Sequence, residues 1–392
     1  MKKLNFIFLL LAVLILSSSC AIDESAVNVT VTNDSTLEII KETVEIQWTD
    51  IINSDPNIHH NSVIVLTSEG NEIPSQVIFN SEKQPELFIF QADVDSKSKS
   101  EYKIRNNYTS VETTGNAGKE IKYAQRPEYK SQAYGRFVPE RMDDYAWENN
   151  LVAFRIYGPA LEEELITNGI DYWSKSTSEL IIDKWYREND YHTDSGEGCD
   201  CYKVGVTLGS GASAPYIDDS LWMSRNFQSW ETLDNGPIRT TVKLTYAPFA
   251  AGEDTVSFVK IISLDANTRF NKMTDIYSGD FNKLPVAAGI ALHPGCRILS
   301  GPDYVAIAEP ASDSKSMLDG DIYIAVLMNG FKKGNDMKNI MAVKKIAPEE
   351  PLVYYMGAAT SKELVINTDD DWERAINRQS GIINNPLKVT VK

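Results

Sequence analysis

Two segments of the 392-residue chain combine arginine, tyrosine and acidic side chains in a pattern that suits chemistry on an anion. The first segment contains three arginines: Arg136, Arg141 and Arg155. In the strand expected at residues 152–157, alternation puts apolar side chains on one face and Arg155 and Tyr157 on the other. A guanidinium beside a phenol suits a groove for a carboxylate or sulfate. The alternative is an exposed strand face with an ion pair, and the residues alone leave both interpretations open.

The second segment, residues 183–203, carries His192, one of only four histidines in the chain. Aromatic and charged residues accompany it: Trp185, Tyr191, Glu197 and Lys203. We expect a loop here, and loops on a rigid β scaffold often carry binding and catalytic residues. A solvated loop histidine without a role is the alternative. His293, which precedes Pro294 at an expected strand end, is the weaker candidate.

These residue types favour a sugar ligand. Aromatic faces can cover the C–H side of a pyranose, and arginines bind carboxylate or sulfate groups through bidentate hydrogen bonds. An anionic oligosaccharide is therefore the expected partner. Its predicted binding residues are Arg136, Arg141, Trp147, Trp185, Glu197 and Arg239.

An all-β scaffold is predicted to position these segments. Alternating apolar and polar stretches, separated by turn residues, predict a small antiparallel sandwich over residues 20–106. Residues 107–130 are polar and weakly patterned and are expected to form a connector. Many further strands with almost no helices between them predict a large antiparallel sandwich over residues 131–392. A short helix is expected at about residues 370–378, where Asp369–Asp371 place negative charge at its start.

The first 19 residues are typical of a lipoprotein signal peptide. Lys2 and Lys3 precede a short apolar run, and Leu-Ser-Ser-Ser leads to Cys20. This pattern resembles a bacterial lipobox, with cleavage before Cys20 and lipid on its thiol. It predicts an outer-membrane lipoprotein that is anchored to the membrane without spanning it. Both the periplasmic and the cell-surface side stay open, since Asp23 and Glu24 form only a short acidic export signal.

Composition excludes several classes of function. With 38 basic and 55 acidic residues the net charge is −17, so little would neutralise a nucleic-acid backbone. No phosphate loop, nucleophile elbow, dinucleotide fingerprint or zinc-protease helix is found in the sequence. Cys199 and Cys201 favour packing over a zinc site, with a bridge from Cys296 to one of them as the alternative. No organic cofactor is expected, although a divalent cation could neutralise a substrate carboxylate.

Four motifs carry a resemblance to a known family: Tyr-Gly-Arg-Phe-Val-Pro-Glu-Arg-x-Asp-Asp-x-Ala-Trp-Glu-Asn (134–149), Phe-Arg-x-Tyr-Gly-Pro-Ala (154–160), Asp-Tyr-His-x-Asp-x-Gly-Glu-Gly (190–198) and Asn-Gly-Pro-Ile-Arg-Thr (235–240). They resemble an uncharacterised-domain family of Bacteroidetes lipoproteins from polysaccharide-utilisation systems. The resemblance implies a galactose-mutarotase-like super-sandwich. It also implies action on uronic-acid oligosaccharides, which in marine members is dehydration of the terminal uronic acid of ulvan fragments.

The implied reaction removes the C5 proton of a uronate and expels the oxygen on C4, which leaves a 4,5-unsaturated residue. Arg155 and its neighbouring arginines would neutralise the carboxylate, and His192 is the expected base. The acid that protonates the leaving oxygen is expected among three residues: Tyr134, Tyr157 and Lys203. Loss of water makes a dehydratase, and loss of a glycosidic oxygen makes a polysaccharide lyase. A non-catalytic glycan-binding lipoprotein and a sugar mutarotase or epimerase are further alternatives.

Overall fold

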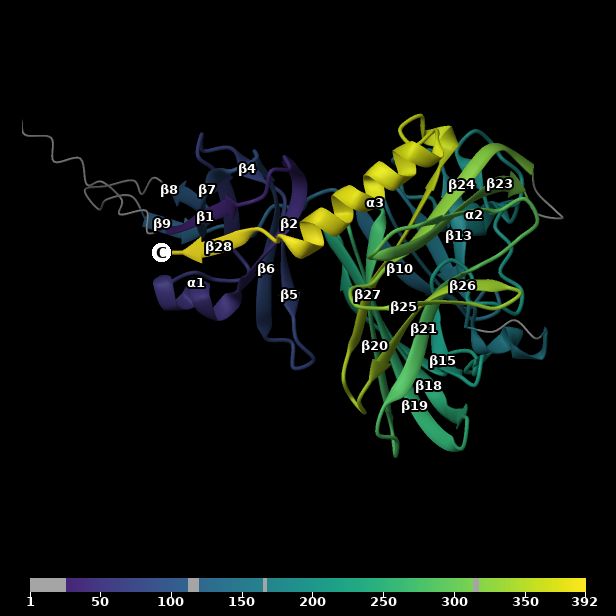
Figure 1. The fold of residues 1–392 in the computed structure, drawn as a ribbon. Helices are drawn as coiled ribbons and strands as arrows, with labels where there is room; N and C mark the ends of the chain where they lie inside the picture. Colours follow the sequence, from purple (N-terminus) through teal and green to yellow (C-terminus); the bar gives the residue numbers. More distant parts are fainter. Residues whose placement is uncertain (1–25, 112–119, 165–167, 313–316) are drawn as a thin grey trace, which may run out of the picture.

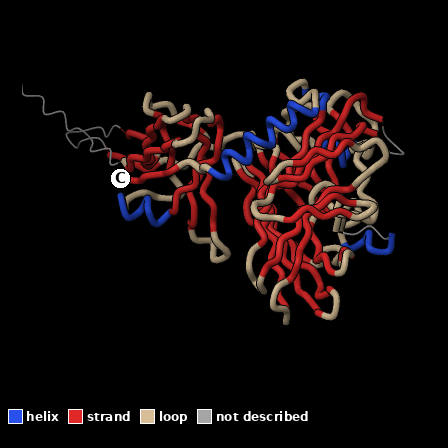
Figure 2. The backbone as a smooth tube through the Cα atoms, viewed as in Figure 1, coloured by secondary structure: helices blue, strands red, loops and turns tan. Residues whose placement is uncertain are grey.

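The computed structural model describes residues 26–111, 120–164, 168–312 and 317–392, so Cys20 and the signal segment lie outside the described residues. The described chain forms a smaller body with the N-terminal strands and a larger body that follows it (Figure 1). Strands dominate both bodies and helices are few (Figure 2). The predicted all-β architecture is therefore confirmed. No helix among these residues is both long enough and apolar enough to cross a membrane.

The smaller sandwich has one sheet of order β28-β1-β7-β3-β4 and a second of order β2-β6-β5. Its elements are β1 (Val27–Asn33), β2 (Ile39–Gln47), α1 (Trp48–Ser54), β3 (Val63–Thr67), β4 (Glu72–Ile73), β5 (Ser75–Phe79), β6 (Pro85–Val94), β7 (Ser98–Asn106) and β28 (Lys388–Val391). In β1, Val27, Val29 and Val31 are buried, and the residues between them are more exposed. This period of two is what a strand with one core-facing side requires.

The expected connector, residues 107–130, contains two antiparallel strands in its described part, β8 (Tyr108–Val111) and β9 (Glu120–Tyr123). After β9 the chain stays close to the smaller sandwich, because Arg126 Nη2 donates a hydrogen bond of 2.7 Å to the carbonyl oxygen of Ser75. The described part of the segment is thus held by contacts with the sandwich that precedes it.

The larger body contains three sheets, and one continuous hydrophobic core joins residues from all of them. The first sheet has the order β10 (Ala133–Val138), β11 (Asp144–Asn149), β12 (Ala153–Ile156), β13 (Ile170–Lys175) and β14 (Gly198–Cys199). The second has the order β16 (Ser220–Leu221), β15 (Ser213–Ile217), β21 (Leu284–Ala291), β26 (Asn339–Ile346) and β25 (Lys332–Asn335). The third has the order β17 (Ser229–Asn235), β18 (Arg239–Ala251), β19 (Asp254–Asp265), β20 (Phe270–Gly279), β27 (Leu352–Thr360), β24 (Met317–Leu327), β23 (Tyr304–Ser312) and β22 (Arg297–Ser300). The short helices of this body are η1 (Pro159–Glu164), α2 (Ile182–Glu188) and η2 (Ser361–Glu363).

The C-terminal helix α3 (Asp369–Asn384) begins with a capping box, in which Thr368 Oγ1 accepts from the Asp371 N–H and the Asp371 carboxylate accepts from the Thr368 N–H. Trp372 and Ile376, one turn apart, are buried against the larger body. The helix runs from the larger body toward the smaller one (Figure 1). It continues to Asn384, beyond the predicted end at about residue 378, and Ile383 in its last turn packs against the same apolar cluster.

The end of the chain returns to the smaller sandwich. After α3, β28 pairs antiparallel with β1, so this strand lies in the first sheet although it falls within the range 131–392. Polar contacts also join the bodies: Arg239 forms ion pairs with Glu45 at 2.6 Å and with Asp265 at 2.5 Å. The two sandwiches are therefore connected both by the chain and by side chains that face each other.

Candidate functional site

The arginine-rich segment lies inside the larger body. All four residues of β12 are buried, because one face packs into the main core and the other is covered by α2 and the chain around it. Arg155 is only 4% exposed. The open groove expected beside this strand is thus not formed, and the ion-pair interpretation applies in a buried form.

Three aspartates surround Arg155, and we call these four residues the Arg155 centre. Arg155 Nη2 is 2.6 Å from Asp171 Oδ2 and 2.9 Å from Asp200 Oδ2. Its Nη1 is 3.7 Å from Asp144 Oδ2, which is too long for a hydrogen bond. The guanidinium also lies over the Tyr157 ring, 5.1 Å from the centroid. Tyr157 is itself buried, with 8% of its surface exposed, and its ring lies against Arg155.

Four buried polar atoms of this region make no hydrogen bond to any other described residue: Asp144 Oδ2, Arg155 Nη1, Asp171 Oδ1 and Tyr186 Oη. Burial raises the pKa of Asp144 to about 7 and also raises the pKa of Asp171. Three carboxylates around one guanidinium carry excess negative charge, so protonation of one of them reduces repulsion. Unpartnered buried atoms cost free energy, so this centre is not optimised for stability alone.

His192 lies at the solvent-facing edge of the Arg155 centre. Its Nδ1 is 3.2 Å from the carbonyl oxygen of Asp200, and its ring packs against Tyr191 with centroids 4.7 Å apart. The Tyr191 hydroxyl accepts a hydrogen bond of 2.6 Å from Arg141 Nε. The structure therefore brings together four of the predicted site residues: Arg141, Arg155, Tyr157 and His192.

The remaining polar residues of these motifs form ion pairs around α2. Arg136 Nε is 2.7 Å from Asp183 Oδ1, and the Tyr134 hydroxyl donates to the same oxygen at 3.4 Å. Glu197 pairs with Lys184 at 2.7 Å. Because protein groups already occupy their charged ends, Tyr134, Arg136 and Glu197 hold the helix and are not presented to a ligand.

Three predicted binding residues lie elsewhere than expected. Trp147 is 1% exposed and donates from Nε1 to Asn271 Oδ1 at 2.7 Å, while Trp185 is 3% exposed and stacks on Trp173. Neither ring can offer a face to a sugar, since other side chains cover it. Arg239 lies at the boundary between the two bodies, in the ion pairs described above. Trp147 and Trp185 therefore pack in the core and do not form the predicted sugar platforms. Arg239 joins the two sandwiches and does not lie at the predicted binding site.

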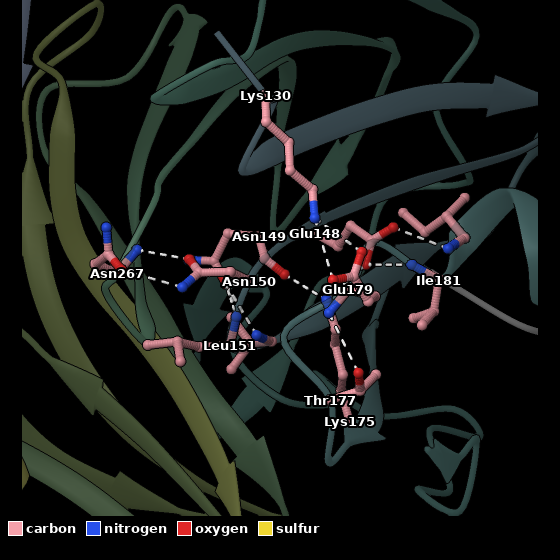
Figure 3. A network of polar contacts seen from close by, with 12 residues as sticks. Lys130, Glu148, Asn149, Asn150, Leu151, Lys175, Thr177, Glu179, Ile181 and Asn267 are labelled. Atoms are coloured by element: carbon pink, nitrogen blue, oxygen red, sulfur yellow. Dashed lines mark hydrogen bonds and ion pairs between the residues drawn. The ribbon is translucent and has the colours of Figure 1, made fainter. Parts of the chain in front are cut away.

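A second buried ion pair anchors α2 in place (Figure 3). Glu148 Oε2 accepts from Lys175 Nζ at 2.9 Å and from the N–H of Ile181 at 2.9 Å, and Oε1 accepts from the N–H of Ile182 at 2.8 Å. Lys175 also donates to the carbonyl oxygen of Asn149 at 2.5 Å. The carboxylate thus caps the start of α2, where the helix dipole favours negative charge. This contact fixes the helix and, through it, the loop that carries His192.

A cavity of about 510 Å³ opens near the Arg155 centre, and we call it the His293 pocket. Four of its lining residues are titratable: Lys203, His293, Glu309 and Lys338. His293 Nδ1 is 2.9 Å from Glu309 Oε1 and 3.0 Å from Oε2. A carboxylate in this position holds the Nδ1–H tautomer, which leaves Nε2 as a proton acceptor. Neither lysine forms an ion pair with another residue in the described ranges.

A short segment connects the pocket to the Arg155 centre. Asp200 is held by Arg155, and Tyr202, two residues later, packs its ring edge-on against His293 with centroids 5.4 Å apart. Lys203 follows and lines the pocket. The Arg155 centre therefore fixes one end of the segment that delivers Lys203 and supports His293.

The cysteines near this segment pack in the protein interior. Cys199 and Cys201 are buried, and the Cys201 thiol donates to Ser174 Oγ at 3.2 Å. No disulfide joins the described cysteines, so the alternative of a bridge from Cys296 is not realised. Within the described ranges, no three His, Cys, Asp or Glu side chains are grouped so that they could hold a metal ion.

Comparison with known proteins places the chain in a family. Residues 31–389 match the family described as "Domain of unknown function (DUF4861)". A protein of Formosa agariphila described as uncharacterised protein P7 is 30% identical, with both chains covered over their whole length. The chain belongs to the DUF4861 family.

Solved structures with the same fold come from Enterococcus faecalis. An α-mannosidase matches with a TM-score of 0.51 at 7% identity, covering 94% of this chain and 46% of that one. A glycosyl hydrolase family 38 protein matches with a TM-score of 0.52 at 8% identity, covering 95% of this chain and 48% of that one. The DUF4861 chain thus spans about half the length of these proteins. At such low identity the likeness shows the sandwich fold alone.

Of the residues that line the pocket of this DUF4861 protein, the sequence patterns select Lys203 and, as the weaker histidine, His293. Glu309 is missed, because the patterns do not show that the residues before β22 lie beside β23. The usable signal was the position of His293 directly after a strand and before Pro294, where a side chain tends to lie at a sheet end. The hairpin of β22 and β23, in which Arg297 lies opposite Ala308, brings the residues before β22 beside Glu309 and so brings the two side chains together.

Proposed function

We propose that this protein is a carbohydrate-active enzyme that removes water from a uronic acid at the non-reducing end of ulvan-type oligosaccharides. One observation carries the proposal: the His293–Glu309 pair faces a cavity that Lys203 and Lys338 also line. A base held by a carboxylate, next to two cations, is the set of groups that β-elimination on a uronate requires. The family resemblance and the sandwich fold support a glycan as the substrate class.

The substrate carboxylate needs a positive partner. Removal of the C5 proton spreads negative charge onto this carboxylate, so a fixed cation beside it lowers the barrier. We assign this role to Lys338. Arg155, the first candidate from the sequence, is committed to Asp171 and Asp200 and does not line the pocket.

His293 replaces His192 as the proposed base. The C5–H bond gives its electrons to the new C4–C5 double bond, His293 Nε2 takes the proton, and the C4–O bond breaks. The leaving oxygen takes a proton from the Lys203 ammonium and departs as water. Glu309 compensates the positive charge that the imidazole ring gains. His192, in contrast, directs Nδ1 to the carbonyl of Asp200 and lies outside the pocket lining.

The cellular setting proposed for the enzyme rests on the first 20 residues of the sequence. The lipobox pattern supports lipid attachment at Cys20 and anchoring in the outer membrane. Labelling with a fatty-acid analogue, compared with a Cys20→Ser variant, tests this part. Label on the native chain alone agrees with it, and no label on either chain contradicts it.

The catalytic assignment is tested with two matched histidine variants. Purified protein, His293→Gln and His192→Gln are incubated with saturated uronate-terminated ulvan oligosaccharides, and near-ultraviolet absorbance reports the new double bond. We expect His293→Gln to lose about 10²–10⁴-fold in kcat, and His192→Gln to keep most of its rate. A large loss of kcat in His192→Gln, with most of the rate kept in His293→Gln, would identify His192 as the base. Binding without absorbance change in the native protein would favour a glycan-binding role.

A further inference from the structure

A second cavity, of about 320 Å³, lies between the two sandwiches. It is lined by β2 of the smaller body, by strands β18, β19, β20 and β27 of the larger body, and by the end of α3 with the chain that follows it. We call it the interbody cavity. None of its lining residues belongs to the His293 pocket. Ligand sites are frequent at such boundaries between domains.

The lining combines apolar and hydrogen-bonding groups. Phe270 and Tyr355 come from the paired strands β20 and β27, and Ile383 is contributed by α3. Polar groups lie among them, including Gln379 and Ser263. A pyranose ring presents apolar C–H groups on its faces and hydroxyls at its rim, so an amphipathic lining of this kind suits a sugar ring.

The charges of the interbody cavity favour an uncharged ligand. Arg239 is already paired with Glu45 and Asp265 at the cavity wall. The other charged lining residues are Lys41, Lys272 and Glu42, so acidic and basic groups are equal in number. The His293 pocket differs, since its two lysines have no ion-pair partner among the described residues and its acid is held by a histidine.

A β-bulge places one carboxyl group in this cavity. The register of β2 against β6 shifts between Ile39 and Glu42, and Lys41 has a φ of 51° while its N–H donates to Asp93 Oδ1 at 2.7 Å. Bulges often redirect a side chain toward a site. Glu42 lines the cavity and makes no hydrogen bond or ion pair with another residue of the described chain. Burial raises the pKa of Glu42 to about 7. A sugar hydroxyl could supply the missing donor.

We propose that the interbody cavity is a second binding site, which takes an uncharged saccharide unit with its face toward Tyr355 and a hydroxyl donated to Glu42. The assignment goes beyond the proposed function and does not depend on it. It gives the smaller sandwich a role in holding glycan, because β2 supplies Glu42.

The test measures binding of xylobiose, cellobiose and maltose to the full-length protein by saturation-transfer NMR and calorimetry. We expect at least one of them to bind, Tyr355→Ala to weaken its affinity at least tenfold, and Glu42→Gln to weaken it several-fold. Val353→Ala is the matched control, since Val353 lies on the same strand, is 41% exposed and does not line the cavity. Its affinity should equal that of the native protein. Where Tyr355→Ala does not fold, Glu42→Gln carries the test.

Three results would overturn the proposal. One is that none of the three disaccharides binds. Another is that Tyr355→Ala and Glu42→Gln bind as tightly as the native protein. A third is that Lys203→Ala abolishes binding, which would place the sugar in the His293 pocket. Because none of these measurements uses turnover, they are independent of whether the His293 pocket catalyses elimination.

Discussion

Two buried ion-pair groups lie on the same sheet of the larger body and differ in how completely they are satisfied. Glu148 and Lys175, at one end of β11 and β13, have a partner for every charged atom. Arg155 with Asp144 and Asp171, toward the other end, leaves buried atoms without hydrogen bonds in the described chain. The first group anchors α2, whereas the second holds the segment that leads to the His293 pocket. We expect from this difference that the first group contributes mainly to stability, and that the second positions the residues of the proposed site at a cost to stability.

The largest effect is expected at the satisfied group. Lys175→Met leaves Glu148 buried with its charge uncompensated, which typically costs about 3–5 kcal/mol. Urea unfolding should show a loss of this size. The double variant Glu148→Gln/Lys175→Met removes both charges and should recover part of it. A loss below about 1 kcal/mol for Lys175→Met would mean that the pair does not anchor the fold.

At the Arg155 centre, activity should respond more than stability. Arg155→Lys keeps the charge but loses the fork geometry that binds Asp171 and Asp200 together. If the centre positions Lys203, kcat should fall about tenfold or more with little change in KM, and the unfolding free energy should fall by only about 1–3 kcal/mol. Arg225→Lys, in a surface ion pair whose arginine side chain is 74% exposed, is the control. Equal kcat in both variants would refute the positioning role.

The pH dependence of stability should separate the Arg155 centre from the rest of the molecule. Asp144 loses its proton near its ordinary pKa of 3.8 when unfolded and at about 7 when folded. Between these values the folded protein binds more protons, so Asp144 makes stability fall as pH rises, by at most a few kcal/mol. Unfolding free energies of the native protein and Asp144→Asn, measured from pH 4 to 8, should show a weaker decline in the variant. Parallel curves would contradict the raised pKa.

The smallest effect is expected at an exposed pair beside the anchor. Lys130 and Glu179 are 3.0 Å apart, but their side chains are 75% and 64% exposed (Figure 3). Solvent screens such pairs, so Lys130→Ala should change the unfolding free energy by less than about 0.5 kcal/mol. A larger loss of unfolding free energy would show that burial does not determine how much each ion pair of this region contributes to stability.

Many of the strands could be predicted from the sequence, because one-sided burial leaves a period of two, as in Val27, Val29 and Val31. The alternation around Arg155 was predicted correctly too. What the pattern could not show is that α2 covers the second face, since this depends on where a segment about 30 residues later in the chain packs. Trp147 and Trp185 were predicted as sugar platforms because the sequence pattern does not show which side chains cover them, and both are in the core.

The candidate site was only partly predictable. Arg155, Tyr157 and His192 come from motifs in neighbouring strands and loops, and the structure does bring them together. His293 and Glu309 meet because β22 pairs with β23, and the register of that hairpin could not be predicted from the sequence pattern. The return of β28 to the first sheet had no local signal in the sequence, because β28 pairs with β1 at the other end of the chain.

The most direct measurement is the mass of the product formed from a saturated uronate-terminated oligosaccharide. The native protein is incubated with the substrate, and the mixture is analysed by mass spectrometry together with near-ultraviolet absorbance. Elimination at the His293 pocket with water as leaving group predicts new absorbance and loss of one water, with the chain length unchanged. New absorbance with shortened chains would make the enzyme a lyase, and unchanged mass and absorbance would contradict elimination altogether.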